Sequence, residues 1–184
     1  LSKTLFTCAD VGAKTVTITA TDFTGNVTVL AAGITVLDTT KPNLNLVSYK
    51  TIFINSAGLA GLSLADVVTG TPFDNCGIAS SSLSKSTFTC ADLGAQTIQV
   101  SVTDNHGNAQ IKSVVVFVED NLFPNVITQN ISVAIDTLTG LATVSPWQLI
   151  ATATDNCGID SAMASFSPSQ FTCNNIGQNT VVVN

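Results

Sequence analysis

Alternating apolar and polar positions run through the chain and predict β-strands. Residues 15–21 read TVTITAT and residues 97–103 read TIQVSVT, so every second side chain is apolar. This period of two, with many β-branched residues, predicts strands buried on one face only. Both segments end in the pattern TDxxGN, at residues 21–26 and 103–108, whose Asp, Asn and Gly residues favour tight turns. We therefore predict two β-hairpins.

The return strand of each hairpin shows a change of phase. Val29 is followed by Ile34 and Val36, and Ile111 is followed by Val116 and Val118, so the apolar set moves from odd to even positions. An extra residue in one strand shifts its alternation in this way. The pattern predicts a β-bulge near residues 31–33 and another near residues 112–114.

The segments between the hairpins predict shorter strands. Residues 44–54 and 126–135 are predicted to be strands, each followed by a turn, at 55–58 and 136–140, and by a short return strand, at 59–64 and 141–145. A brief helical turn fits within residues 65–73 and 146–154, with Trp147 as a packing residue. Because no apolar pattern of helical period persists for a helix length, the fold class is all-β, arranged as a sandwich.

Motifs recur along the chain at a period of about 82 residues. Cys8, Cys90 and Cys173 occupy equivalent places, and so do Asp22 and Asp104. Recurrence at a fixed period indicates an array of small domains. We place a complete repeat at residues 42–123, the C-terminal part of a repeat at 1–41 and the N-terminal part of another at 124–184. We thus expect the chain to be a segment of a longer protein.

Five cysteines fall at two places in this repeat, which predicts disulfides. Cys76 and Cys90 are 14 positions apart and Cys157 and Cys173 are 16 apart. This spacing predicts the bonds Cys76–Cys90 and Cys157–Cys173, with the partner of Cys8 before residue 1. One pair per domain indicates an oxidising, extracellular setting. A zinc site would need further Cys or His ligands, which no repeat supplies.

Composition excludes several classes of function. The net charge is −6, Arg is absent and the six Lys residues form no cluster, which argues against nucleic acid and against an anionic membrane surface. No apolar run approaches the roughly 20 residues of a membrane helix. The single histidine, His106, is predicted to be an exposed turn residue, and no catalytic motif is present. We expect no enzymatic activity.

Several short motifs together resemble a known family. DNCG at residues 74–77, FTCADLG at 88–94, TDNHGN at 103–108 and the V-x-D-x-x-x-P linkers from Val36 and Val118 are similar to the hyalin repeat (HYR) group of immunoglobulin-like domains. The tandem form most resembles the repeat region of SprB-type gliding adhesins of the Bacteroidota. The resemblance implies a structural segment of a long cell-surface filament for adhesion and gliding motility, exported by type IX secretion.

The implied partners are neighbouring repeats, surface polysaccharide and the motility and secretion machinery. The alternative functions are an accessory spacer of a secreted multidomain enzyme and a ligand-binding module for polysaccharide. The latter needs an exposed aromatic platform, and the chain has one Trp and one Tyr.

Two kinds of surface site complete the sequence-based picture. In such an array the linker residue Asp38 is expected to approach Asp74, Asn75 and Asp104, which would suit an interdomain Ca²⁺ ion. The same residues also fit a purely turn-forming role. The family resemblance further implies O-glycosylation of D-[ST]-x triplets, which occur at Thr39, Thr137 and Ser161.

Overall fold

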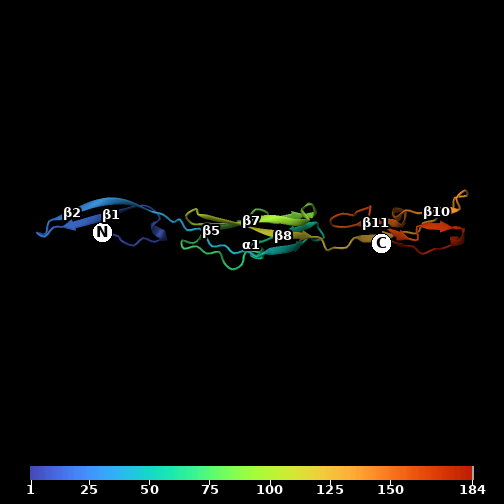
Figure 1. Ribbon diagram of the computed structural model, residues 1–184, viewed down its shortest axis with the longest axis horizontal. Helices are drawn as coiled ribbons and strands as arrows, with labels where there is room; N and C mark the ends of the chain where they lie inside the picture. Colours follow the sequence, from blue (N-terminus) through green and yellow to red (C-terminus); the bar gives the residue numbers. More distant parts are fainter. Residues whose placement is uncertain (184) are drawn as a thin grey trace. The chain divides into compact units, whose positions relative to one another are not determined.

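The computed structural model describes residues 1–183, and strands make up most of its regular structure (Figure 1). This confirms the all-β fold class. The strands are β1 (Gly12–Thr21), β2 (Val27–Val36), β3 (Tyr49–Phe53), β4 (Leu59–Gly61), β5 (Ile78–Leu83), β6 (Thr87–Thr89), β7 (Gly94–Asp104), β8 (Ala109–Glu119), β9 (Asn125–Thr128), β10 (Leu141–Thr143), β11 (Ile150–Thr154), β12 (Phe166–Ser167), β13 (Gln170–Thr172) and β14 (Val182–Val183).

The helical elements are all short. Two α-helical turns are present, α1 (Leu64–Val67) and α2 (Pro146–Leu149), together with three 3₁₀ turns, η1 (Cys8–Asp10), η2 (Cys90–Asp92) and η3 (Cys173–Asn175). α2 lies within the expected residues 146–154, whereas α1 begins at Leu64, one residue before the expected range 65–73, and each begins after a serine. The backbone N–H of Ser63 donates to Asp66 and that of Ser145 donates to Gln148, so both have a capping box.

The chain forms two compact units. Unit 1 comprises residues 1–52, 61–88 and 92–118, and unit 2 comprises residues 53–60, 89–91 and 119–183. These units do not follow the repeat boundaries inferred from sequence, since residues 53–60 and 89–91 of the predicted middle repeat belong to unit 2. The repeat boundaries remain a prediction.

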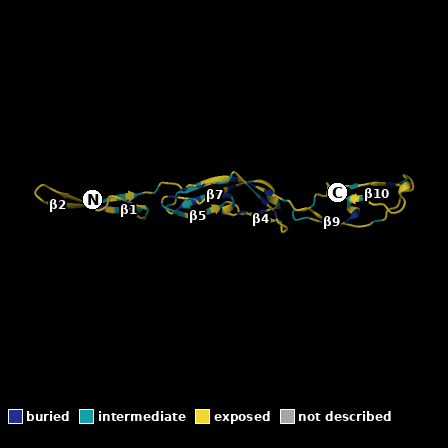
Figure 2. Ribbon diagram, turned by 90° about the horizontal axis from the view of Figure 1, so that it is seen from below, coloured by how far each residue is buried: buried dark blue, intermediate teal, exposed yellow. Residues whose placement is uncertain are grey.

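The main core lies in unit 1, around a sheet of strand order β3-β8-β7-β5. Alternate residues of β7 (Ile98, Val100 and Val102) and of β8 (Val114, Val116 and Val118) are buried, as the period of two predicts. Phe88 and Val67 are also fully buried. In Figure 2 the buried residues gather around β7, whereas most of the β1–β2 hairpin is exposed.

Both predicted hairpins are present. β1 pairs with β2 and β7 pairs with β8, in antiparallel register. Each turn contains a glycine at positive φ, Gly25 at +92° and Gly107 at +91°. Positive φ is accessible to glycine without a steric penalty, which explains why glycine occupies the fifth position of both TDxxGN patterns.

The predicted bulges are wrong. The β1–β2 ladder runs without a break from Thr21↔Val27 to Gly12↔Val36, and the β7–β8 ladder from Thr103↔Ala109 to Gly94↔Val118. The early apolar residue of each return strand points outward instead, since Val29 is 59% exposed and Ile111 is 56% exposed. In each return strand, an exposed apolar side chain on the solvent face produced the same sequence pattern as a change of phase. Bulges occur elsewhere, in β5 and β11.

Two further predictions need correction. The strand expected at residues 44–54 is shorter, because Asn43 and Leu46 form only isolated bridges, with Phe73 and Val68, before β3 begins. Trp147, predicted to be a packing residue, is 40% exposed, and its indole N–H donates to the carbonyl oxygen of Ser161. The buried residue of that turn is Leu149.

Unit 2 contains three two-stranded ladders, β9–β11, β10–β13 and β12–β14. Its buried apolar residues are few and include Ala142, Leu149, Ile150 and Phe171. β10 and α2 follow one another as β4 and α1 do, about 82 residues earlier in the chain. The order of local elements therefore recurs with the period of the sequence motifs.

A pair of adjacent valines tests the orientation of β8. Val116→Ala removes fully buried methyl groups and should lower the free energy of unfolding by about 2 kcal/mol. Val115→Ala, on the exposed side, should change it by less than about 0.5 kcal/mol. Urea unfolding followed by circular dichroism measures both. Equal losses, or a larger loss for Val115→Ala, would contradict the continuous register.

Candidate functional site

The disulfides join segments far apart in the chain. Cys8 is bonded to Cys76 and Cys90 to Cys157, each with a Cα–Cα distance of 5.3 Å. The predicted bonds Cys76–Cys90 and Cys157–Cys173 are therefore wrong, and so is the expectation that Cys8 finds its partner before residue 1. Cys173 is exposed and unbonded in this chain.

The length of β7 explains why Cys76 and Cys90 do not pair. Ile78, two residues after Cys76, pairs with Asp104 at the end of β7, whereas Cys90 precedes the start of β7 at Gly94 by four residues. An 11-residue strand is about 35 Å long. The Cα atoms of a disulfide lie within about 7 Å of each other, so cysteines at opposite ends of β7 cannot bond.

Both disulfides follow one rule. The cysteine of an FTC motif bonds the cysteine of the DNCG motif that follows it by 68 or 67 residues. The surroundings also match, because Sγ of Cys8 lies 3.4 Å from the carbonyl oxygen of Asn75 and Sγ of Cys90 lies 3.4 Å from that of Asn156. A disulfide sulfur carries no proton, so these are packing contacts. The same junction is built twice, once in each unit.

Three carboxylates meet beside the Cys8–Cys76 bond. One oxygen each from Asp38, Asp74 and Asp104 lies within 4.8 Å of the others. Asp38 follows β2, Asp74 precedes β5 and Asp104 ends β7, so three separate segments of unit 1 contribute. The side chain of Asp38 is 2% exposed, and residues Asp74 and Asp104 are 6% and 2% exposed. We call these residues the carboxylate cluster.

Asp104 is fixed by its own turn. Its Oδ1 accepts from the backbone N–H groups of His106 and Asn108, both at 2.8 Å, and its Oδ2 accepts from Nδ2 of Asn108 at 2.7 Å. Burial raises the pKa of Asp104, but these hydrogen bonds outweigh it and hold the pKa below its ordinary value. Asp104 is therefore ionised at neutral pH.

The other two members are held more loosely. Oδ1 of Asp74 accepts from the N–H of Cys76 at 2.8 Å, while its Oδ2 is buried and has no hydrogen-bond partner. Oδ1 of Asp38 accepts from the N–H of Thr40, and the carbonyl oxygen of Asp38 accepts from Nδ2 of Asn108 at 3.1 Å. The Asn108 side chain thus connects the linker with the β7–β8 turn. Asn75, predicted as a fourth member, directs its amide nitrogen toward Sγ of Cys76 instead.

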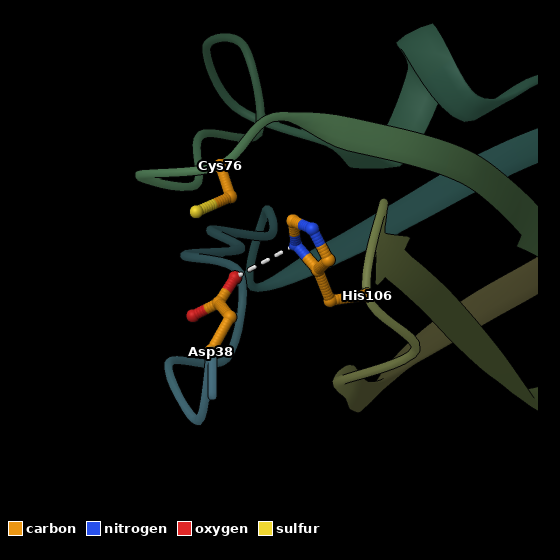
Figure 3. Close-up of side chains that lie close together, drawn as sticks. All are labelled: Asp38, Cys76 and His106. Carbon is orange, nitrogen blue, oxygen red and sulfur yellow. Dashed lines mark hydrogen bonds and ion pairs between the residues drawn. The ribbon is translucent and has the colours of Figure 1, made fainter. Parts of the chain in front are cut away.

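His106 lies at this site, which the sequence did not indicate. Its Nδ1 is 3.2 Å from Oδ2 of Asp38, and its side chain is only 21% exposed (Figure 3). Figure 3 also shows Cys76 facing the same space. The residue does occupy the turn after β7, but the prediction that it is exposed is wrong. The direction of its ring depends on Asp38, 68 residues away, which no local pattern reveals.

The corresponding contacts in unit 2 use amide groups. Nδ2 of Asn156 donates to Oδ1 of Asp120 at 3.2 Å and to the carbonyl oxygen of Asn55 at 3.3 Å. Asp155, the counterpart of Asp74, accepts from the N–H of Cys157 at 2.8 Å. Asp120 and Asp155 thus stand at this junction where Asp38 and Asp74 stand at the first.

The 3₁₀ turns that carry the FTC cysteines are capped by polar side chains. Asp10 accepts from the N–H of Thr7 and Asn175 accepts from that of Thr172, both at 2.9 Å. The ion pair with Lys3, followed by the Thr7 hydrogen bond, lowers the pKa of Asp10 to about 2. Asp10 and Asn175 therefore stabilise the start of these turns.

The three predicted glycosylation residues, Thr39, Thr137 and Ser161, are exposed. Each follows an aspartate whose Oδ1 accepts from the N–H two residues on, at 3.0 to 3.1 Å. Their hydroxyl groups therefore lie on similar Asx turns, although modification itself remains a prediction.

A cavity of about 710 Å³ in unit 2 offers no acid or base. It is lined by residues from 128–149 and 171–183, and its described lining contains no ionisable side chain. Among the described residues, no helix has the length and apolar character needed to cross a membrane. Neither a scan of protein-family models nor a search of curated protein sequences finds a match to this chain.

Tryptic mapping tests the disulfide pairing directly. Cleavage after Lys, except at Lys41 before Pro42, places Cys8 in peptide 4–14, Cys76 in 51–85, Cys90 in 86–112, and Cys157 with Cys173 in 113–184. Without reductant, mass spectrometry should find 4–14 joined to 51–85 and 86–112 joined to 113–184. Alkylation before reduction should label Cys173 alone.

The alternative pairing has a different signature. If Cys76 were bonded to Cys90, peptides 51–85 and 86–112 would be joined to each other, and peptide 4–14 would carry a labelled thiol. That result would refute the structure's connectivity.

Proposed function

We propose that this chain is a non-catalytic, load-bearing segment of a cell-surface adhesin filament, built from tandem immunoglobulin-like repeats. One observation carries the proposal: both disulfides link an FTC cysteine to the DNCG cysteine of the next predicted repeat. A disulfide inside one domain stabilises that domain alone. A disulfide between successive domains also transmits tension from one to the next.

The disulfides create a short covalent path along the chain. Between Cys8 and Cys173 there are 165 peptide steps, of which 68 and 67 lie inside the disulfide loops. Only 14 steps from Cys76 to Cys90 and 16 from Cys157 to Cys173 remain on the path. Tension applied at the two ends is therefore carried by the two disulfides and the short segments between them. The residues inside the disulfide loops are bypassed. The strands inside the loops can stay folded while the filament is under load.

The same bonds contribute to stability. Closing a loop of nearly 70 residues restricts the unfolded chain by about 4 kcal/mol in the chain-entropy account. The total stability of a small domain is about 5 to 15 kcal/mol, so each bond supplies a substantial part of it. This is useful in unit 2, whose buried apolar set is small.

Cell-surface adhesion rests on two supports. Two disulfides favour an oxidising, extracellular setting, and the recurring motifs resemble those of gliding adhesins. In this role the segment separates an adhesive region from the cell and resists extension when that region grips a substratum. Type IX export and contacts with motility proteins belong to the same proposal.

Location can be tested on source cells. Antibodies raised against residues 1–184 should label unfixed cells at the surface, and mild reduction followed by shear should weaken attachment. A different result would be detection of the protein only in the culture medium, as part of a polypeptide that also has catalytic activity. That result would favour the alternative function, an accessory spacer of a secreted enzyme.

Single-molecule pulling tests the covalent path. With handles at both termini, the oxidised chain should extend fully without releasing the two loops. Adding reductant should then release about 450 Å of contour, from 135 steps of about 3.4 Å each less the two bridges. If the disulfides instead joined Cys76 to Cys90 and Cys157 to Cys173, reduction would release about 90 Å of contour length.

Cysteine variants provide the controls. Cys8→Ser leaves one loop, so reductant should release about 220 Å. Cys173→Ser removes an unbonded thiol and should leave the release near 450 Å. A Cys8→Ser chain that behaved like the parent would refute the load path.

A further inference from the structure

We propose that Asp38, Asp74 and Asp104 bind one Ca²⁺ ion. This inference concerns the carboxylate cluster of unit 1 and does not depend on the load-bearing role. Three nearly buried carboxylates converge from three segments, with one oxygen of each within 4.8 Å of the others. Like charges this close repel one another, and burial strengthens the repulsion. A cation bound among the three carboxylates would relieve this repulsion.

The Asp74 carboxylate supplies an independent sign of a missing ligand. Its Oδ1 accepts from the N–H of Cys76, but its Oδ2 is buried and has no donor within hydrogen-bond distance. Buried polar atoms are nearly always paired, because an unpaired one loses its hydration without replacement. An ion bound between this carboxylate and its two neighbours would satisfy that oxygen.

Within residues 1–183, no lysine forms an ion pair with the carboxylate cluster. Lys50 pairs with Asp66, Lys85 pairs with Asp92, and Nζ of Lys112 donates to the carbonyl oxygen of Leu44. Among the ion pairs within residues 1–183, the cluster takes part only through Asp38 and His106. One histidine side chain faces three carboxylates at this site.

The ligand atoms favour calcium. Ca²⁺ takes carboxylate and carbonyl oxygens at 2.3–2.6 Å, so two ligands on opposite sides of one ion lie about 4.8 Å apart. The separation of the three oxygens fits this limit. Structural zinc sites are instead built from Cys and His ligands. Cys76 is bonded to Cys8 and offers no thiolate, so His106 is the only nitrogen or sulfur ligand at this site.

Bound calcium would lock the linker to the sheet. Asp38 belongs to the segment after β2, whereas Asp74 and Asp104 flank the β5–β7 edge. The ion would hold these parts together beside the Cys8–Cys76 bond. We expect a dissociation constant on the order of 10⁻⁴ to 10⁻³ M, as in other extracellular calcium modules.

Calorimetric titration and thermal unfolding of the disulfide-bonded chain test the site. Ca²⁺ should bind with a stoichiometry of one and raise the unfolding temperature, with the folding equilibrium constant increased about 100-fold when free Ca²⁺ is 100 times the dissociation constant. EDTA should reverse the effect. Mg²⁺, which demands a smaller octahedral shell, should act at least tenfold more weakly.

Asp74→Asn should change the stability of the protein in opposite directions in EDTA and in Ca²⁺. The amide oxygen can still accept from the N–H of Cys76, so the local turn is kept while one negative charge is lost. In EDTA the variant should be more stable than the parent, because repulsion is relieved. In Ca²⁺ it should be less stable and bind at least tenfold more weakly. Asp38→Asn should behave in the same way.

Asp22→Asn is the matched control. Asp22 makes the same turn contacts as Asp104, accepting from Thr24 and Asn26, but it lies in the exposed β1–β2 turn. Any loss of stability in this variant should be equal with Ca²⁺ and with EDTA. Equal calcium responses of Asp22→Asn and Asp74→Asn would overturn the assignment.

The single histidine gives a readout that needs no variant. His106 contacts Asp38, so its ring resonances should shift as Ca²⁺ is added and saturate with the calorimetric affinity. Absence of heat, of stabilisation and of a His106 shift at 10 mM Ca²⁺ would overturn the proposal. So would equal effects of Mg²⁺, which would indicate general charge screening. Neither outcome would alter the disulfide path or its contour length.

Discussion

The Cys8–Cys76 bond is the constraint on which the organisation of unit 1 depends. It brings together residues separated by 68 positions and so closes a loop that includes the β1–β2 hairpin and the linker after it. Once Cys8 is fixed beside the end of β7, the linker has little freedom, and Asp38 meets the β7–β8 turn. Cys90–Cys157 imposes the same constraint in unit 2.

The surroundings of a motif decide what the motif does. Asp22 and Asp104 begin identical TDxxGN turns and accept the same pattern of hydrogen bonds. Asp22 is exposed and its carboxylate only shapes the turn. Asp104 is 2% exposed and lies within 4.8 Å of Asp38 and Asp74, so the same local geometry places a carboxylate in a buried cluster. A single turn motif thereby serves structure at one position and a candidate site at the other.

The sequence predicted what local periodicity controls and missed what distant contacts control. The two hairpins, their turns and both helical turns were predictable, since their signals lie within a few residues. The bulges were wrong because an outward Ile111 resembles a shifted phase, and only burial distinguishes the two. The approach of Asp38 to Asp74 and Asp104 was expected from the order of repeats. Disulfide pairing and the contact of His106 with Asp38 depend on tertiary geometry, which a spacing of 14 residues does not encode.

The disulfide and the carboxylate cluster resist different motions. A linker and one disulfide attach two segments at two points, and two points still allow rotation about the line that joins them. Contacts of Asp38 with His106 and Asn108 add a third attachment, which opposes that rotation. Because hydrogen bonds and partly exposed ion pairs are weak, this third attachment is the weakest of the three. A cation at the cluster would strengthen this third attachment, which no covalent bond supports. That is a physical reason for three acidic residues to meet there.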